Sequence, residues 1–172
     1  MLNGHSRLRT SSKVINCMIR YSRQLLQADG YLAAAGRRLL AEVARDCHAD
    51  ESTLWLIAED GRHLEGALNH GRTPQLLERA TVALVDSVVG MVASTGIATA
   101  VGPDDQINTT VDQQTGTPTR AMIAAPVLVG DDPAGVLSAI NPKEGRLFDA
   151  QALETLQWKA YLMGLILGQR NA

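Results

Sequence analysis

Apolar residues recur at spacings of three and four in three segments of the chain, a pattern typical of helices with one buried face. The first segment spans residues 12–27, and Gly30 ends it. The second spans 31–48, and the third spans 150–168 with Asp149 as its expected N-cap. The last turns of the third helix are apolar on nearly every side, so this helix needs packing partners on both sides.

Between these helices the pattern shortens to brief apolar runs bounded by turn residues, which indicate β-strands. Residues 52–58 and 62–68 are expected to form a hairpin across an acid-Gly turn. A second hairpin joins 121–129 to 135–140 in the centre of the sheet. Pro126 has no amide hydrogen to donate, so it places its strand at an edge or at a bulge.

The segment between the two hairpins is less regular. A short helix is expected at 74–79, and residues 80–85 are either a strand or a loop. Residues 88–95 have the pattern of a further helix, which Gly96 ends in a left-handed conformation. Gly90 inside this helix costs about 1 kcal/mol relative to Ala, which predicts close packing at that position.

Residues 102–119 form the longest irregular stretch of the chain. They follow an expected strand at 97–101, are rich in Asp, Thr, Gln and Gly, and lack apolar periodicity. Loops of this length in compact domains are usually functional or disordered, so we expect a lid here. The order of the elements predicts an α+β fold in which helices are segregated to the faces of an antiparallel sheet.

Length and composition favour a single globular domain. The chain has 172 residues, of which 45% are hydrophobic and 20% charged. It has no apolar run near the roughly 18 residues of a membrane span and no signal peptide, so we expect a cytoplasmic protein with no membrane partner. Cys17 and Cys47 have no companion at metal or redox spacing, and we interpret both as small core residues.

Charge is distributed unevenly along the chain. Residues 1–40 carry seven Lys or Arg side chains against one acidic residue, Asp29. A basic arm can bind phosphates, but these side chains flank an apolar stripe and favour a solvated helix face. Aromatic residues make up only 3% of the chain, so we do not expect nucleic acid as a partner.

Five fragments of the chain, in their order and spacing, resemble the GAF domain, a small-molecule sensing module of phosphodiesterases, bacterial transcription activators, histidine kinases and phytochromes. The fragments are residues 49–56 ahead of the turn at 59–61, then 88–96, 119–127, 135–141 and Phe148-Asp149. The resemblance covers roughly residues 30–170. Because this family is divergent, a specific function does not transfer with the resemblance.

The resemblance implies a profilin-like or PAS-like fold with a central antiparallel six-stranded sheet. The N- and C-terminal helices would pack on one face of this sheet and often form a dimer interface. The ligand pocket would lie on the other face, under the long loop. We therefore divide the chain into an N-terminal amphipathic helix for dimerisation at 1–29 and a GAF-like domain at 30–172.

Candidate site residues come from the strands and the loop beside the implied pocket. Trp55 and Met122 either line the pocket or pack in the core, since strand residues alternate between faces. Arg120 either holds a carboxylate, nitrate or phosphate at the pocket mouth or closes a loop at the surface. The expected ligand-binding residues are Trp55, Asp105, Thr109, Arg120, Met122, Ala124 and Asn141.

The chain does not match the reactive or cofactor-binding versions of the family. Free methionine sulfoxide reductases need several cysteines around the pocket, whereas both cysteines here fall on N-terminal helices. Bilin-binding members need a Cys-His pair beyond the long loop, and cyclic-nucleotide-binding members carry acidic residues where this chain has Gln151-Ala152. The four histidines lack metal-ligand spacing and a paired nucleophile. We therefore expect no catalytic residue and no metal, and no cofactor can be named.

The sequence thus predicts a regulatory domain, not an enzyme. We expect it to bind a small molecule of unknown identity and to signal through its terminal helices as a homodimer, with an effector domain or a protein as partner. The alternative is a degenerate GAF domain with a filled pocket, which serves only as a dimerisation or docking module.

Overall fold

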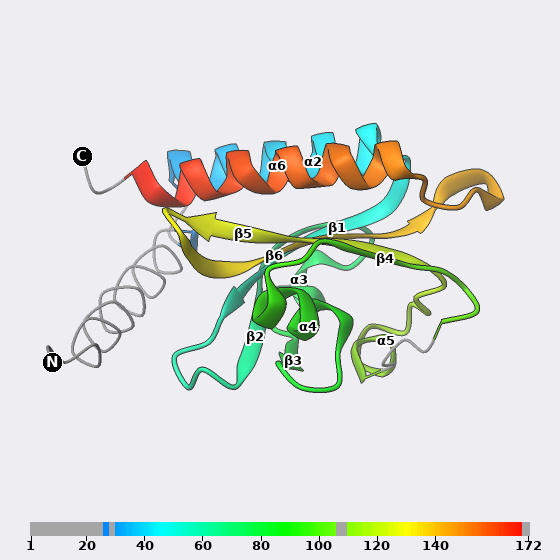
Figure 1. Ribbon diagram of the computed structural model, residues 1–172, viewed down its shortest axis with the longest axis horizontal. Coiled ribbons are helices and arrows are strands. Elements are labelled where there is room, and N and C mark those ends of the chain that lie inside the picture. Colours follow the sequence, from blue (N-terminus) through cyan, green and yellow to red (C-terminus); the bar gives the residue numbers. More distant parts are fainter. Residues whose placement is uncertain (1–25, 28–29, 106–109, 170–172) are drawn as a thin grey trace, which may run out of the picture.

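The computed structural model describes residues 26–27, 30–105 and 110–169 of the chain (Figure 1). Most of the helix expected at 12–27, including Cys17, lies outside the described residues, as does the site candidate Thr109. The division of the chain at residue 30 therefore stays a prediction.

An antiparallel sheet of six strands, in the order β3-β2-β1-β6-β5-β4, forms the centre of the described structure. The strands are β1 (Ala49–Ile57), β2 (His63–His70), β3 (Thr81–Ala83), β4 (Thr99–Val101), β5 (Met122–Val129) and β6 (Asp132–Pro142). The predicted α+β class and six-stranded sheet are confirmed. For residues 80–85 the sequence allowed a strand or a loop, and the structure has the strand β3 there.

Helices cover both faces of this sheet (Figure 1). They are α2 (Tyr31–Asp46), α3 (Pro74–Leu77), α4 (Val88–Thr95), α5 (Thr110–Thr115), the 3₁₀ turn η1 (Lys143–Gly145) and α6 (Ala150–Gly168). The sequence predicted α2, α3, α4 and α6 at nearly these bounds.

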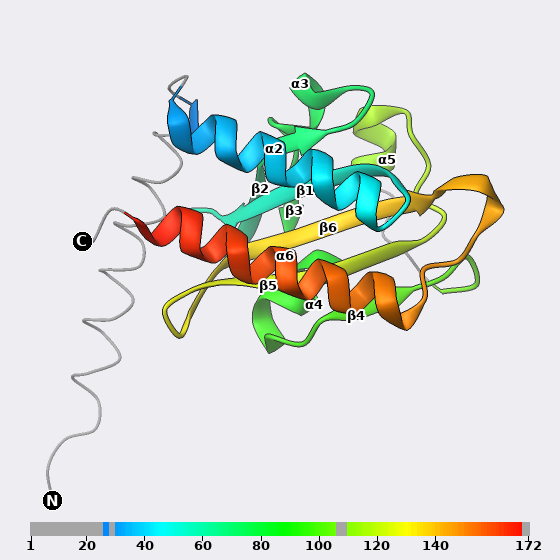
Figure 2. The same ribbon diagram turned by 90° about the horizontal axis from the view of Figure 1, so that it is seen from above.

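The long helices α2 and α6 lie side by side and antiparallel on one face of the sheet (Figure 2). Asp149 caps α6 as predicted, because its Oδ1 accepts the amide hydrogen of Ala152 at 2.8 Å. Lys159 of α6 binds Glu42 at 3.0 Å and Asp46 at 3.1 Å, so ion pairs join α6 to α2. The larger hydrophobic core between these helices and the strands includes Leu40, Leu54, Leu137, Leu156 and Met163.

The opposite face of the sheet carries the short helices α3, α4 and α5 (Figure 1). The hydroxyl of Ser87 caps α4 by accepting from the Gly90 amide at 2.9 Å, and Gly96 ends the helix with φ of 69°. A Cβ at Gly90 would meet the carbonyl oxygens of Ala83 and Leu84, which confirms the close packing predicted there.

Several strand boundaries differ from the prediction by one to three residues, most of all the starts of β1 and β6. β1 begins at Ala49 because that residue pairs with Pro142 at the far end of β6. β6 begins at Asp132, so the second hairpin has a two-residue turn instead of the longer connection expected. In both cases pairing with the neighbouring strand continues past the apolar run from which the strand was predicted.

Pro126 was expected at an edge or at a bulge, and it lies at a local edge of the described sheet although β5 is not an edge strand. β4 pairs with β5 only from Met122 to Ala124, so β5 has no outer neighbour at Pro126. The missing amide hydrogen of the proline therefore costs no hydrogen bond to an outer strand of the described sheet.

The interpretation of residues 102–119 as wholly irregular was wrong, because residues 110–115 form α5. The helix has one turn and a half and little apolar surface, so its sequence shows no period. Asp112 and Thr119 hold the following turn in place by the hydrogen bonds described below.

Candidate functional site

Alternation along the central strands sends one set of side chains under α2 and α6 and the other set to the opposite face. In β1, Leu54 and Leu56 belong to the core beneath the long helices, while Trp55 belongs to a second core on the opposite face. In β6, Leu137 belongs to the core beneath the long helices and Val136 to the core on the opposite face. The face covered by α3 and α4 therefore has a smaller hydrophobic core of its own.

A pocket lies within this smaller core. The cavity volume is about 50 Å³. That is room for roughly three to five water molecules, since one water needs about 10–15 Å³ of such space. A cavity of this size accepts only a small ligand. The sheet forms the floor of the pocket with Thr53, Trp55, Met122, Ser138 and Ile140.

Short helices and the segment after them cover the pocket. The start of α4 contributes Val88 and Val89, and α5 contributes Val111 and Asp112. Thr119 follows from the end of the long loop and donates to Asp112 twice, from its amide at 2.8 Å and from its hydroxyl at 2.7 Å. Residues 102–119, predicted as a lid, thus supply part of the pocket lining. The two hydrogen bonds from Thr119 hold the end of this segment against α5.

Two polar groups of the floor are held by hydrogen bonds. Trp55 Nε1 donates to Ser138 Oγ at 3.0 Å. Asn69 Nδ2 donates to Thr53 Oγ1 at 2.9 Å. Thr53 and Ser138 are partners in the register of β1 and β6, so their side chains lie next to each other. The floor is therefore an apolar surface with two adjacent hydroxyl groups.

A buried carboxyl group lies beside this floor. Glu51 is only 2% exposed and shares one face of β1 with Thr53. Burial raises the pKa of Glu51, while its hydrogen bond with Asn69 and the charge of Arg72 act in the opposite direction. Asn69 Oδ1 is buried with no hydrogen-bond partner in the described part of the chain.

The structure brings only some of the expected site residues together. Trp55 and Met122 line the pocket. Ala124 is buried in the same small core without lining the cavity. Asp105 lies away from the pocket lining, where its Oδ2 accepts from the Gly102 amide at 2.7 Å.

The side chain of Asn141 binds the backbone of Arg120 next to the pocket. Asn141 has a left-handed backbone, with φ of 54°. Its Oδ1 accepts from the Arg120 amide at 2.8 Å, and its Nδ2 donates to the Pro118 carbonyl at 2.9 Å. These bonds fix the segment that carries Thr119 into the lining, whereas the Arg120 side chain is exposed and does not line the cavity.

Reasoning from the sequence did not name any of the five polar residues of the lining, which are Thr53, Ser87, Asp112, Thr119 and Ser138. Alternation could have found Thr53, because it lies two residues before Trp55 on the same strand. Ser138 needed the register of β1 and β6. Asp112 gave no signal, because the short helix that carries it has no apolar period.

Cys47 lies away from the pocket, in the core beneath the long helices. Its Sγ donates to the Ala152 carbonyl at 3.5 Å. Burial raises the pKa of this thiol to about 11, so it is protonated at neutral pH and is a poor nucleophile. The structure therefore gives Cys47 a packing role.

Among residues 26–27, 30–105 and 110–169, no group of three or more His, Cys, Asp and Glu side chains is arranged to bind a metal ion. Over the same ranges, no helix has both the length and the apolar character needed to cross a membrane.

Comparison with known proteins agrees with this architecture. The family model of the GAF domain matches residues 32–167. The chain belongs to the GAF domain family. Members of this family are sensory and regulatory modules, generally not catalytic, and they bind small molecules and often act in dimers with effector domains. No curated protein sequence matches this GAF domain.

Solved GAF domains share its fold. The GAF-B domain of DevS from Mycobacterium smegmatis is 20% identical with a TM-score of 0.65, over 80% of this chain and 93% of that one. The GAF domain of a phosphoenolpyruvate-protein phosphotransferase from Coxiella burnetii is 12% identical with a TM-score of 0.67, over 92% and 95%. The blue-light absorbing form of the PixJ GAF domain from Thermosynechococcus elongatus is 14% identical with a TM-score of 0.63, over 88% of each chain.

Proposed function

We propose that this GAF domain is a ligand-sensing regulatory domain, not an enzyme, and that it works in the cytoplasm. It binds a small molecule in the pocket under α4 and α5 and passes the bound state through its terminal helices in a homodimer. The observation that carries the proposal is the pocket, whose floor combines apolar side chains with two hydroxyl groups in fixed positions. An effector domain or a protein partner receives the signal.

Within this proposal, the expected site residues take different roles. Trp55 and Met122 contact the ligand, because they line the cavity. Ala124 fills the core behind them, and Asn141 supports the lid through the backbone of Arg120.

A continuous set of contacts supports communication between the pocket and α2. Thr53 accepts from the Asn69 side chain, and the backbone N–H of Asn69 donates to Glu78 Oε1 at 3.2 Å. Arg37 of α2 donates to both oxygens of Glu78, at 2.6 Å and 3.2 Å. Glu78 directly follows Leu77, which lines the pocket. A ligand that moves α3 would therefore also act on α2 through this ion pair.

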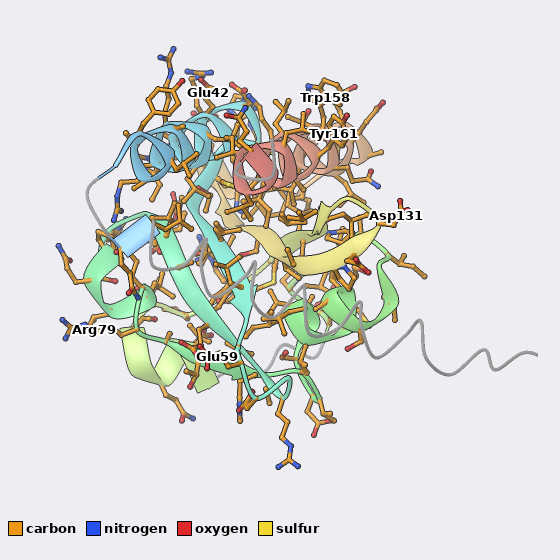
Figure 3. The ribbon with its side chains drawn as sticks, turned by 90° about the vertical axis from the view of Figure 1, so that its left-hand side faces the viewer. Glu42, Glu59, Arg79, Asp131, Trp158 and Tyr161 are labelled. Atoms are coloured by element: carbon orange, nitrogen blue, oxygen red, sulfur yellow. The ribbon has the colours of Figure 1, made fainter. Side chains whose placement is uncertain are left out.

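An exposed apolar stripe on α6 supports the homodimer. Trp158, Tyr161 and Leu165 are 60%, 55% and 49% exposed, and their spacing puts them on one side of the helix. The rings of Trp158 and Tyr161 stack with centroids 5.4 Å apart. Figure 3 shows both residues on the outer side of α6, away from the sheet. Such a stripe is typical of a helix that pairs with a second helix.

The size of the cavity favours a second candidate function. Pockets that bind small molecules usually have volumes of about 300–1,000 Å³, whereas this cavity has about 50 Å³. A GAF domain with a filled pocket would serve only as a dimerisation or docking module.

A ligand screen separates the two candidates. Native mass spectrometry of the purified protein reports its oligomeric state and any ligand that copurifies. Thermal unfolding is then measured with nucleotides, oxyanions, amino acids, aromatic acids, and small ketones and amides. A sensor gains stability with at least one class, by about 2.7 kcal/mol when the ligand is at 100 times its Kd. A dimer that responds to no class favours the docking module.

A further inference from the structure

We propose that the pocket is specific for a small, uncharged molecule with a hydrogen-bond acceptor oxygen, and that the hydroxyl groups of Thr53 and Ser138 both donate to that molecule. This inference rests on the proposed function, because it names the class of ligand that the same pocket would take. It follows from the direction of three hydrogen bonds, two donated by Asn69 and one by Trp55, and from the charges around the cavity.

The hydrogen bond to Thr53 has a fixed direction. Asn69 Nδ2 lies 3.2 Å from the carbonyl oxygen of Ser52, which can only accept, so the amide nitrogen of Asn69 must be on that side. The same nitrogen lies 2.9 Å from Thr53 Oγ1 and donates to it. The Thr53 oxygen is therefore an acceptor in this bond, and its own hydrogen remains to be donated.

The hydrogen bond to Ser138 has a fixed direction for a similar reason. An indole nitrogen can only donate, so Ser138 Oγ must accept from Trp55 Nε1. The hydroxyl hydrogen of Ser138 then points away from the indole.

Both hydroxyl hydrogens lack an acceptor in the described part of the chain. Thr53 is 5% exposed and Ser138 is 2% exposed, so bulk water does not reach them freely. Buried donors nearly always have a partner. Because the two residues are register partners and both line the cavity, one occupant of the cavity can accept from both.

The charges around the cavity select against an anion. Asp112 is the one charged side chain of the lining in the described structure, and no Lys, Arg or His side chain belongs to that lining. The Asp112 carboxylate already accepts two hydrogen bonds from Thr119. A carboxylate or phosphate would lose its hydration and meet a negative charge without a compensating cation. An uncharged carbonyl compound avoids both penalties.

Cyclopentanone is a small, uncharged probe of this chemistry with one acceptor oxygen. Cyclopentane, cyclopentanecarboxylate and cyclopentylammonium are matched probes without an acceptor, with a negative charge and with a positive charge. Binding is followed by ¹H–¹⁵N NMR through the indole signal of Trp55, whose nitrogen touches Ser138. The indole of Trp158, exposed on α6, is the internal control.

Cyclopentanone is expected to shift the Trp55 indole signal saturably and to leave the Trp158 signal in place. Thr53→Val and Ser138→Ala should each weaken binding about fivefold, the value of one ordinary hydrogen bond. Thr53→Ser and Ser138→Thr keep the hydroxyl groups and should bind like the wild type. Thr95→Val removes a hydroxyl on α4 outside the lining and is the matched control, and melting curves show which variants fold.

Equal binding of cyclopentane and cyclopentanone, tighter binding of the carboxylate or of the ammonium compound, or unchanged binding by Thr53→Val would overturn the inference. So would the absence of any saturable shift with cyclopentanone, which would mean that water alone occupies the floor. The proposed function fails separately, when no compound of the wider ligand screen shifts the Trp55 signal.

Discussion

The indole nitrogen of Trp55 in β1 lies 3.0 Å from the hydroxyl oxygen of Ser138 in β6. The bond is diagonal, since the register partner of Ser138 is Thr53. It therefore holds a large ring across the floor of the pocket and orients the serine hydroxyl at the same time. The polar part of the pocket is built before any ligand arrives, which lowers the ordering cost of binding.

The first prediction concerns this bond. Trp55→Phe keeps an aromatic ring on the floor but removes the donor and part of the packed volume. We expect the free energy of unfolding to fall by about 1–3 kcal/mol, measured by urea denaturation. Trp158→Phe, the same change at the exposed position on α6, should stay within about 0.5 kcal/mol of the wild type. Equal effects at the two positions would contradict this role of Trp55.

The second prediction concerns the support of the lid by Asn141. Asn141→Gly removes both side-chain hydrogen bonds to residues 118–120 but suits the left-handed backbone, so we expect a loss of about 1–2 kcal/mol. Asn141→Ala loses the same bonds and adds roughly 1 kcal/mol of backbone strain.

Hydrogen exchange at the Arg120 amide should become faster in both variants, because its acceptor is Asn141 Oδ1. Slow exchange at Arg120 in the glycine variant would show that something other than Asn141 holds the segment.

The third prediction is a dependence of stability on pH through Glu51. Burial raises its pKa in the folded state, so folding favours the protonated form. The stabilising contribution is complete below the ordinary pKa of a glutamate and is lost as pH rises through the raised value. Glu51→Gln should therefore raise Tm at pH 8 by about 2–4 °C, which corresponds to about 1 kcal/mol in a domain of this size.

The gain from Glu51→Gln should shrink as the pH is lowered toward 4, where the wild-type carboxyl is protonated as well. Asp131→Asn in the exposed turn between β5 and β6 serves as the control for the loss of one negative charge. A gain that is constant across the pH range would point to packing and not to ionisation.

The fourth prediction tests the homodimer. Leu165→Glu puts a charge into the exposed stripe of α6 and should weaken dimerisation at least tenfold, as measured by sedimentation velocity over a range of concentrations. Leu147→Glu makes the same change at a leucine that is 68% exposed outside the stripe, and its dimer should be unchanged. If both variants dimerise like the wild type, the stripe is not the interface.

The fold was largely readable from the sequence because its elements carry strong local signals. Helix α6 has a capping residue and a long apolar stripe, and the two hairpins have clear turns. Strand ends such as Ala49 were missed because pairing with a partner strand, and not local pattern, decides them. Helix α5 was missed because a helix so short carries no period.

The candidate site was predicted less completely. Trp55 and Met122 were found by their residue type and by the alternation of strands, and both line the pocket. Ser138 depends on the register of β1 and β6, which no single segment encodes. Asn141 was expected at the ligand, but its side chain binds the backbone of residues 118–120 from a left-handed position near the end of β6.

The most direct test of the central claim is ligand-induced stabilisation in a protein whose pocket is filled by mutation. Val88→Trp fills the cavity from α4, whereas Met91→Trp places the same ring on the exposed side of that helix. Thermal unfolding of both variants and the wild type is measured with the compounds of the ligand screen. We expect a rise in Tm for the wild type and Met91→Trp and none for Val88→Trp. An equal rise in all three proteins, or no rise in the wild type with any compound, would contradict the account.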